Sequence, residues 1–165
     1  MEDMCQLSGR LTEDKYKGSH EQIAKIVKRF SSNPLFDLTR LYELVLFAWL
    51  TGNGDMHLKN FSLFKDPAVG WKLSPAYDLL NTRLVIPEER DPEELALTLS
   101  GKRSRFKPET FEEFGKTIGL NLKQIQNIQG RRLGRKARFI RKVDQSFLSD
   151  GLKTLYKELL AQRFE

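Results

Sequence analysis

The sequence predicts a mainly α-helical domain that contains one short β-hairpin. Two observations support this prediction: segment 37–51 is apolar on nearly every side of a helix, and two aromatic-rich apolar runs, 61–64 and 71–73, flank a turn. With 39% hydrophobic and 30% charged residues, the 165-residue chain has the composition of a soluble globular protein. Its length fits one domain with a hydrophobic core of its own.

The first half of the chain should form two helices and then the hairpin. Ser19 and Gln22 have the spacing of a capping box, so a helix should begin there and end near Ser31. The apolar segment 37–51 predicts the next helix, which should be buried at the centre of the domain. The hairpin at 61–73 should follow it.

The second half of the chain predicts mostly helix. Segment 81–92 has charges, two prolines and no regular periodicity, so it should be irregular, and segment 95–99 alternates weakly like one short strand. Three helices should complete the domain, at about 108–118, 122–143 and 150–163. Gly130 and Gly134 lie inside the middle helix and should weaken or break it.

The segment after the central helix carries the strongest functional signal. In the segment Gly-Asp-Met-His-Leu-Lys-Asn, Asp55 precedes Asn60 by five positions. This is the spacing of a phosphotransferase catalytic loop, in which the aspartate orients a hydroxyl and accepts its proton and the asparagine holds Mg²⁺ on the nucleotide phosphates. A second carboxylate is needed for the metal. The hairpin should bring Asp78 back beside Asn60 to supply it.

Two other residues of the same loop suit this chemistry. Lys59 is a candidate for contact with a phosphate, and His57 is a candidate for bracing the loop. An ordinary helix-ending turn would also gather Gly, Asn and Asp. The downstream Pro-Ala-Tyr-Asp at 75–78 favours the phosphotransferase interpretation, because it supplies the second carboxylate at the expected distance.

Three blocks of the sequence together resemble a known family. They read Glu-Asp-Met-Cys-Gln at 2–6, Gly-Asp-Met-His-Leu-Lys-Asn-Phe-Ser at 54–62 and Leu-Ser-Pro-Ala-Tyr-Asp-Leu at 73–79. In this combination they resemble the C-terminal lobe of the HipA family of serine/threonine kinases, the toxins of bacterial toxin–antitoxin systems. The resemblance implies a protein-kinase-like C-terminal lobe over residues 1–165, in which the hairpin carries the metal-binding aspartate. The implied site residues are Asp55 as catalytic base, Asn60 and Asp78 as Mg²⁺ ligands, and His57, Lys59 and Tyr77 lining the nucleotide site.

The resemblance also implies cofactors and partners. The cofactors are ATP and Mg²⁺. The substrate is a protein with a serine or threonine hydroxyl, for which the family suggests aminoacyl-tRNA synthetases. The partner is a helix-turn-helix antitoxin at operator DNA. A complete kinase of this family carries an N-terminal lobe, with the phosphate-covering loop and the adenine hinge, ahead of the block at 2–6. The sequence begins at that block. We therefore expect the N-terminal lobe to lie outside this chain and the chain alone to be inactive.

Two alternative functions stay open on the sequence alone. A lobe that keeps the kinase fold without its ATP-covering half would be a non-catalytic binding or scaffold module. Small-molecule and lipid phosphotransferases form the second alternative, because their loops also read Gly-Asp-x-x-x-x-Asn. The block at 2–6 does not suggest those enzymes.

The net charge of +6 is concentrated in two clusters, at 102–107 and 131–142, the second with seven cations in twelve residues. Such density suits phosphate binding, including DNA contact within an antitoxin complex. The residues of the second cluster that are expected at phosphates are Arg131, Arg132, Arg135, Lys136 and Arg138. A solvated helix face is the alternative, because Leu133, Ala137 and Ile140 share one apolar side.

The sequence does not predict membrane insertion, disulfide bonds or a zinc site. No apolar run approaches the ~20 residues of a membrane span, and the acidic start does not resemble a signal peptide, so we expect a cytoplasmic protein. Cys5 is the single cysteine and has no Cys or His neighbours at metal-ligand spacing.

Overall fold

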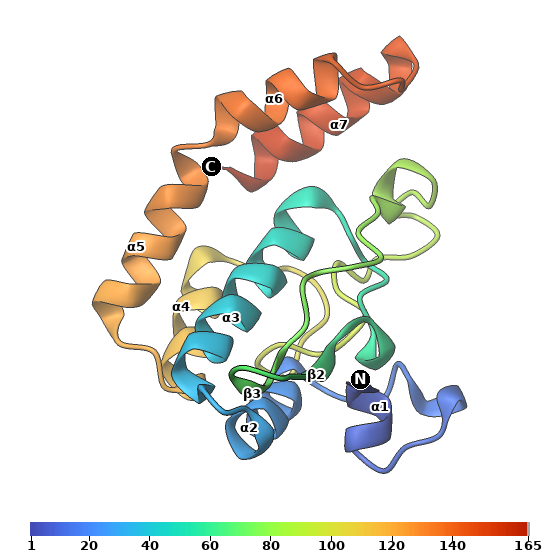
Figure 1. Ribbon diagram of the computed structural model, residues 1–165. Helices are drawn as coiled ribbons and strands as arrows, with labels where there is room; N and C mark the ends of the chain where they lie inside the picture. Colours follow the sequence, from blue (N-terminus) through green and yellow to red (C-terminus); the bar gives the residue numbers. More distant parts are fainter. Residues whose placement is uncertain (165) are drawn as a thin grey trace.

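The computed structural model describes residues 1–164, apart from the side chain of Leu133. The long helix α3 (Pro34–Thr51) crosses the middle of the molecule (Figure 1). Helix α2 (His20–Phe30) and a small sheet lie near one end of α3, and an antiparallel helix pair formed by residues 136–163 lies at the other end (Figure 1). The fold is therefore mainly helical with one small sheet, which confirms the predicted class.

The central helix has a capped start and a glycine stop. The Asn33 side chain accepts a hydrogen bond from the backbone N–H of Phe36, and Pro34 occupies the first turn, where its missing N–H is not needed. This cap starts the helix three residues before the predicted Asp37. Gly52 ends it with a left-handed φ of 77°, a conformation that favours glycine. Ten of the 18 residues of α3 are buried, which confirms its predicted central position.

The sheet has three antiparallel strands in the order β1-β2-β3. They are β1 (Glu2–Asp3), β2 (Ser62–Asp66) and β3 (Gly70–Leu73). Strands β2 and β3 form the predicted hairpin, with Leu63 opposite Leu73. The sequence prediction does not include β1, because a strand of two residues shows no periodicity. Through β1 the first residues of the chain lie against the loop that precedes β2.

Segment 95–99 is not a β-strand, so this prediction was wrong. Among the described residues its only β-type pairings are two isolated bridges, one to Ser19 and one to Lys102. The three leucines of the segment are fully buried in the hydrophobic core. Ala96 is buried as well, so four of the five side chains face the core and the weak alternation in the sequence does not reflect a strand with one buried face.

The C-terminal helices are α4 (Pro108–Ile118), α5 (Leu122–Leu133), α6 (Lys136–Asp144) and α7 (Asp150–Arg163). The first and last match the prediction. The helix predicted at 122–143 is instead two helices, and Figure 1 shows that α6 leaves α5 in a new direction. The break falls at Gly134, whereas Gly130 stays inside α5.

Four short helical segments connect these elements: α1 (Met4–Leu7), η1 (Thr12–Asp14), η2 (Leu58–Asn60) and η3 (Thr82–Leu84). The core joins α2, α3, α4 and the sheet, and its largest buried side chains include Tyr42, Phe61, Phe111 and Phe114. Within residues 1–164 we find no helix whose length and apolar character would let it cross a bilayer.

Candidate active site

The buried amide of Asn53 is one of the links between the loop after α3 and the segment after the hairpin. Its Oδ1 accepts a hydrogen bond from the backbone N–H of Asp55 at 3.2 Å, and its Nδ2 donates to the backbone carbonyl of Asp78 at 3.4 Å. Asn53 is only 1% exposed. This side chain therefore fixes the backbone of both carboxylate residues relative to one another.

Asn60 and Asp78 are in direct contact, as the sequence predicts. The Nδ2 of Asn60 donates to Oδ2 of Asp78 at 2.5 Å, and Oδ1 of Asn60 accepts from the backbone N–H of His57 at 3.0 Å. Asp78 has a left-handed φ of 54°, which is uncommon for a residue other than glycine. Such strain persists only where the surroundings impose it, and it is concentrated at functional sites.

The carboxylate of Asp55 accepts a hydrogen bond from the hydroxyl of Tyr16 at 2.7 Å. Burial, and then the hydrogen bond to Asp55, raises the pKa of Tyr16 to about 12, so its hydroxyl keeps its proton at neutral pH. The ring of Tyr16 also lies edge-on to His57, with 5.1 Å between ring centroids. Tyr16 is thus a site residue that the sequence interpretation missed.

His57 lies beneath this cluster as a neutral side chain. It is 7% exposed, and burial, followed by the charge of Lys15, lowers its pKa below the usual value. Its Nδ1 is buried without a hydrogen-bond partner among the described residues. A buried ring nitrogen of this kind can still bind a ligand or a water molecule.

The structure holds Lys59 and Tyr77 in contacts with the sheet. The ammonium of Lys59 forms an ion pair with Asp3 at 3.0 Å, and this hydrogen bond raises the pKa of Lys59. The hydroxyl of Tyr77 lies 2.5 Å from Ser62 Oγ and donates to the carbonyl of Lys59 at 2.7 Å. Both side chains brace β1 and β2 against the loop.

The carboxylate of Asp78 suits a metal ion that arrives with its own oxygen ligands. Neither Asp55 nor Asp78 forms an ion pair with any residue of the described chain. The same part of the chain holds no group of three or more His, Cys, Asp or Glu side chains that could bind a metal unaided. Mg²⁺ typically takes one or two carboxylates together with substrate phosphates, so the carboxylate of Asp78 fits a metal–nucleotide complex, whereas Asn60 turns its Nδ2 toward Asp78 in this structure.

The five basic residues expected at phosphates fall into two groups. Arg131 forms an ion pair with Glu43 at 3.0 Å, while Arg132 donates to the carbonyl of Glu43 at 2.8 Å and lies over the ring of Phe47. Burial lowers the pKa of Arg132. The other three, Arg135, Lys136 and Arg138, have no side-chain ion pair within residues 1–164.

The fold is that of a kinase-like lobe, and it is similar to two solved structures. One is the complex of HipA, HipB and operator DNA from Shewanella oneidensis MR-1, with a TM-score of 0.83, 23% identity, and coverage of 99% of this chain and 42% of that chain. The other is the Helicobacter pylori kinase CtkA, with a TM-score of 0.57, 12% identity, and coverage of 98% of this chain and 66% of that chain.

The sequence profile of the HipA-like C-terminal domain matches residues 1–143, so the chain belongs to this family. A Haemophilus influenzae protein named "Putative kinase" is 32% identical over 116 residues, which are 62% of this chain and 34% of that protein. The serine/threonine-protein kinase toxin HipA of Shewanella oneidensis is 33% identical over 93 residues, 48% of this chain and 21% of the toxin. The chain thus spans about a third or less of these relatives.

Proposed function

We propose that this chain is the catalytic C-terminal lobe of a HipA-like serine/threonine kinase, which transfers a phosphoryl group from ATP to a protein hydroxyl. The observation that carries the proposal is the contact between Asn60 and Asp78, linked through Asn53 to the loop that bears Asp55. Phosphoryl transfer depends mainly on positioned oxygen groups, and this contact gathers them from segments 18 residues apart.

Asp55 is the proposed base. Tyr16 occupies one of its carboxylate oxygens, and no residue among 1–164 hydrogen-bonds the other, which is free to orient a substrate hydroxyl and accept its proton. Because Tyr16 keeps its proton at neutral pH, it acts on Asp55 only as a donor. Tyr16 is therefore a positioning residue in this proposal.

Asn60 and Asp78 are the proposed metal ligands. When bound, Mg²⁺ and ATP supply the transferable phosphoryl group and neutralise its charge. The backbone N–H of His57 holds the amide oxygen of Asn60 in place, and the neutral His57 ring faces the same cluster. Lys59 and Tyr77 would act from the flank of the nucleotide site, because their side chains fix the sheet against the loop.

We further propose that the adenine hinge and the phosphate-covering loop come from outside residues 1–165. The partners would be a HipB-type antitoxin and a protein substrate, such as an aminoacyl-tRNA synthetase, in the cytoplasm. Family membership and the similarity to HipA in its complex with HipB and operator DNA support this part of the proposal. In such a complex Arg135, Lys136 and Arg138 are the basic residues free to meet phosphates.

The test is phosphate transfer to a protein substrate by the protein that contains this lobe and an ATP-covering lobe. Asp55→Asn should reduce transfer at least about a thousandfold with little change in nucleotide binding, whereas Asp78→Ala should lower both the rate and the Mg²⁺-dependent affinity. Asp144→Asn, at an exposed ion pair with Lys157, is the matched control and should keep the wild-type rate. Full activity and full Mg²⁺ dependence in Asp78→Ala would remove Asp78 from the site.

A further inference from the structure

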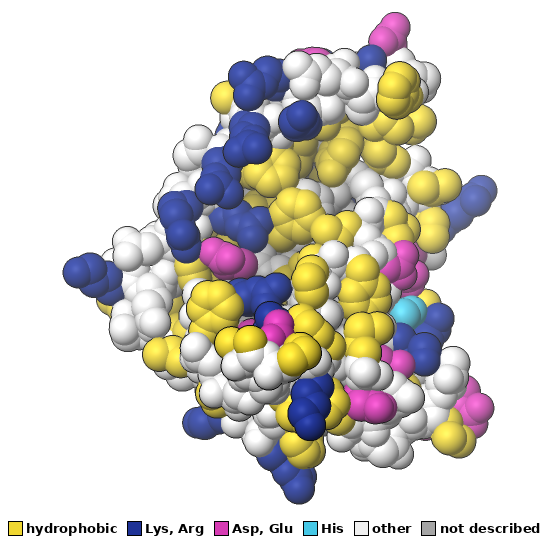
Figure 2. All heavy atoms as spheres, viewed as in Figure 1, with side chains coloured by type: hydrophobic (Ala, Val, Ile, Leu, Met, Phe, Trp, Pro, Cys, Tyr) yellow, Lys and Arg dark blue, Asp and Glu magenta, His cyan; other side chains and the backbone are white. Residues whose placement is uncertain are grey.

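A hollow of about 460 Å³ lies between α3, the segment 73–79 and the α5–α6 junction. Figure 2 shows an indentation on this face, bordered by a row of Lys and Arg side chains. Its volume lies within the roughly 300–1,000 Å³ typical of small-molecule sites. Its lining includes none of the side chains assembled around Asp55 and Asp78, so this basic hollow is a separate site.

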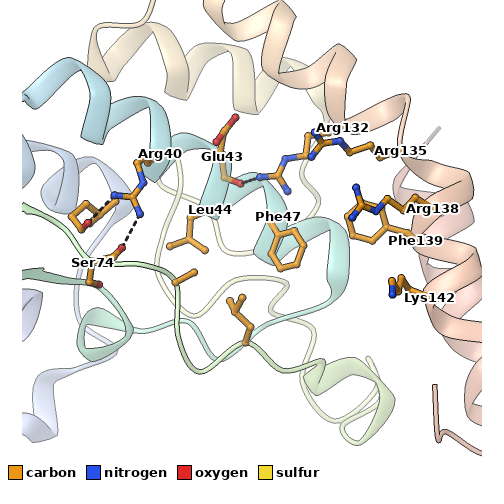
Figure 3. Close-up of a pocket in the computed structure, with 13 residues that line it drawn as sticks. Arg40, Glu43, Leu44, Phe47, Ser74, Arg132, Arg135, Arg138, Phe139 and Lys142 are labelled. Atoms are coloured by element: carbon orange, nitrogen blue, oxygen red, sulfur yellow. Dashed lines mark hydrogen bonds between the residues drawn. The ribbon is translucent and has the colours of Figure 1, made fainter. Parts of the chain in front are cut away.

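One wall of the basic hollow carries cations without partners. Arg138 and Lys142 lie four residues apart on one side of α6, and Arg135 directly precedes the first residue of this helix. Figure 3 shows that they face the hollow together. None of the three side chains has a hydrogen bond or ion pair to any described residue. Three like charges held together in this way repel each other unless an anion joins them.

The opposite walls do not supply that anion. Glu43 is the only carboxylate among the lining residues, and it is paired with Arg131 at 3.0 Å. Arg40 donates to the carbonyls of Leu73 at 2.8 Å and Ser74 at 3.3 Å. The dashed lines in Figure 3 mark these contacts. The charge of Arg40 is balanced by the buried carboxylate of Asp37 at 3.7 Å, so the excess positive charge comes from Arg135, Arg138 and Lys142. The hollow therefore has a fixed excess of positive charge.

The floor of the basic hollow is apolar and partly aromatic. Leu44, Phe47, Leu79 and Phe139 contribute to it, and the rings of Phe47 and Phe139 lie 6.0 Å apart between centroids. Leu79 is 46% exposed, so apolar surface remains open to solvent here. A flat apolar group would bury this surface, and arginine forks bind phosphate oxygens in a bidentate manner.

We propose that the basic hollow binds a nucleoside phosphate, with its base on the aromatic floor and its phosphates on Arg135, Arg138 and Lys142. A ligand of this class combines a flat body, which suits the aromatic floor, with clustered negative charge, which suits the cationic wall. Duplex DNA is the alternative that the test has to exclude, because Arg135, Arg138 and Lys142 are exposed along the border of an open depression of about 460 Å³.

The probe is ADP carrying a fluorescent label on the ribose, titrated into the protein in EDTA. Without Mg²⁺ the proposed catalytic residues contribute little to binding, so the signal reports the basic hollow. Arg138→Ala should weaken binding about tenfold or more, since it removes charge-assisted hydrogen bonds. Arg141→Ala is the matched control: it is the same substitution on the same helix, at an exposed arginine outside the lining, and should change affinity less than about twofold.

Two further measurements distinguish binding of the probe inside the hollow from nonspecific electrostatic attraction to the positively charged surface. Ala76→Trp, at an exposed lining position, should block the hollow and abolish binding although every cation remains. Inorganic pyrophosphate should displace the probe at least about tenfold less well than unlabelled ADP, because it lacks a base to cover the floor.

Several results would overturn the proposal. These are equal losses in Arg138→Ala and Arg141→Ala, unchanged binding in Ala76→Trp, pyrophosphate competing as well as ADP, or displacement by duplex DNA that Ala76→Trp does not affect. Loss of probe binding in Asp78→Ala would also overturn it, because the probe would then occupy the catalytic edge. That last result would leave the proposed kinase function standing, so the two proposals fail separately.

Discussion

The candidate active site and the basic hollow are built in opposite ways. In the active site, Asn53, Asn60 and Tyr16 direct their hydrogen bonds to neighbours within the chain, which fixes the two carboxylates before any ligand binds. In the basic hollow, Arg138 and Lys142 extend from α6 without a partner in the described residues. Internal bonding of the first kind suits chemistry that needs exact positions, and unpaired charge of the second kind suits capture of an oppositely charged ligand.

This difference predicts where substitutions change folding stability. Residues that shape the active-site loop should be costly to replace even without ligand. Exposed cations of the basic hollow should affect ligand binding but hardly affect folding.

The largest effect should come from Gly52→Ala at the start of the loop. Gly52 has a φ of 77°, and an added Cβ would lie 2.7 Å from Leu159 and 2.8 Å from Asn81. We expect the free energy of unfolding in denaturant to fall by about 2–5 kcal/mol, from left-handed strain and from overpacking.

Gly101→Ala is the matched control for Gly52→Ala. Gly101 has nearly the same φ, 76°, but an added Cβ would meet nothing within 4 Å. Its substitution should cost only the strain, about 1–2 kcal/mol. Equal losses in the two variants would mean that the crowding around Gly52 does not matter, and the active-site loop would be less tightly packed than we infer.

The second prediction concerns the pH dependence of the free energy of unfolding. Of the two regions, only the active site, through His57, should contribute to this dependence near neutral pH. Burial lowers the pKa of His57, and it lowers that of the core residue His20 to about 3, so the unfolded chain binds these protons more readily than the folded protein. The stability that each neutral histidine contributes is complete above its unfolded pKa, about 6.5, and is lost as the pH falls below it.

Unfolding free energies measured between pH 7 and pH 5 test this point. Wild-type stability should decrease with falling pH, and the decrease should be smaller in His57→Gln, by at most about 1 kcal/mol over this range. Arg138→Ala should keep the wild-type pH dependence, because arginine does not titrate there. The same slope in His57→Gln as in the wild type would show that His57 becomes protonated as easily in the folded protein as in the unfolded chain.

The sequence predicts the parts of the active site that are encoded locally. Asp55 and Asn60 share one loop, and a hairpin with a clear turn returns Asp78 to Asn60. Spacing along the sequence is therefore enough to predict that these three residues lie close together. Tyr16 was missed because its contact to Asp55 spans 39 residues and depends on how the loop after η1 packs. Asn53 has a local signal, since the side-chain oxygen of an asparagine often accepts a hydrogen bond from the backbone N–H two residues later and so forms an Asx turn.

The basic hollow shows why tertiary arrangement is harder to predict. The sequence presents residues 131–142 as one basic cluster on one predicted helix, with cations that either contact phosphates or face solvent. The break at Gly134 turns α6 away from α5, so Arg131 and Arg132 pack against α3 while Arg138 and Lys142 face the hollow. A glycine predicts that a break is possible, but the new direction of the chain depends on contacts between α6 and α7.

The smallest effect on stability is expected for Arg138→Ala in the basic hollow, and Arg132→Ala, at another lining residue, is its matched comparison. Arg132 is half-buried, donates to the carbonyl of Glu43 and lies 5.3 Å from the centroid of the Phe47 ring, so its removal should cost about 1–2 kcal/mol of unfolding free energy. Arg138 is exposed and unpaired within the described chain, and its removal should change stability by less than about 0.5 kcal/mol. Urea unfolding of both variants measures the difference. A loss in Arg138→Ala as large as that in Arg132→Ala would mean that Arg138 already has a partner in the folded protein. The contrast between an active site whose side chains are hydrogen-bonded within the chain and a basic hollow whose cations are unpaired would then no longer hold.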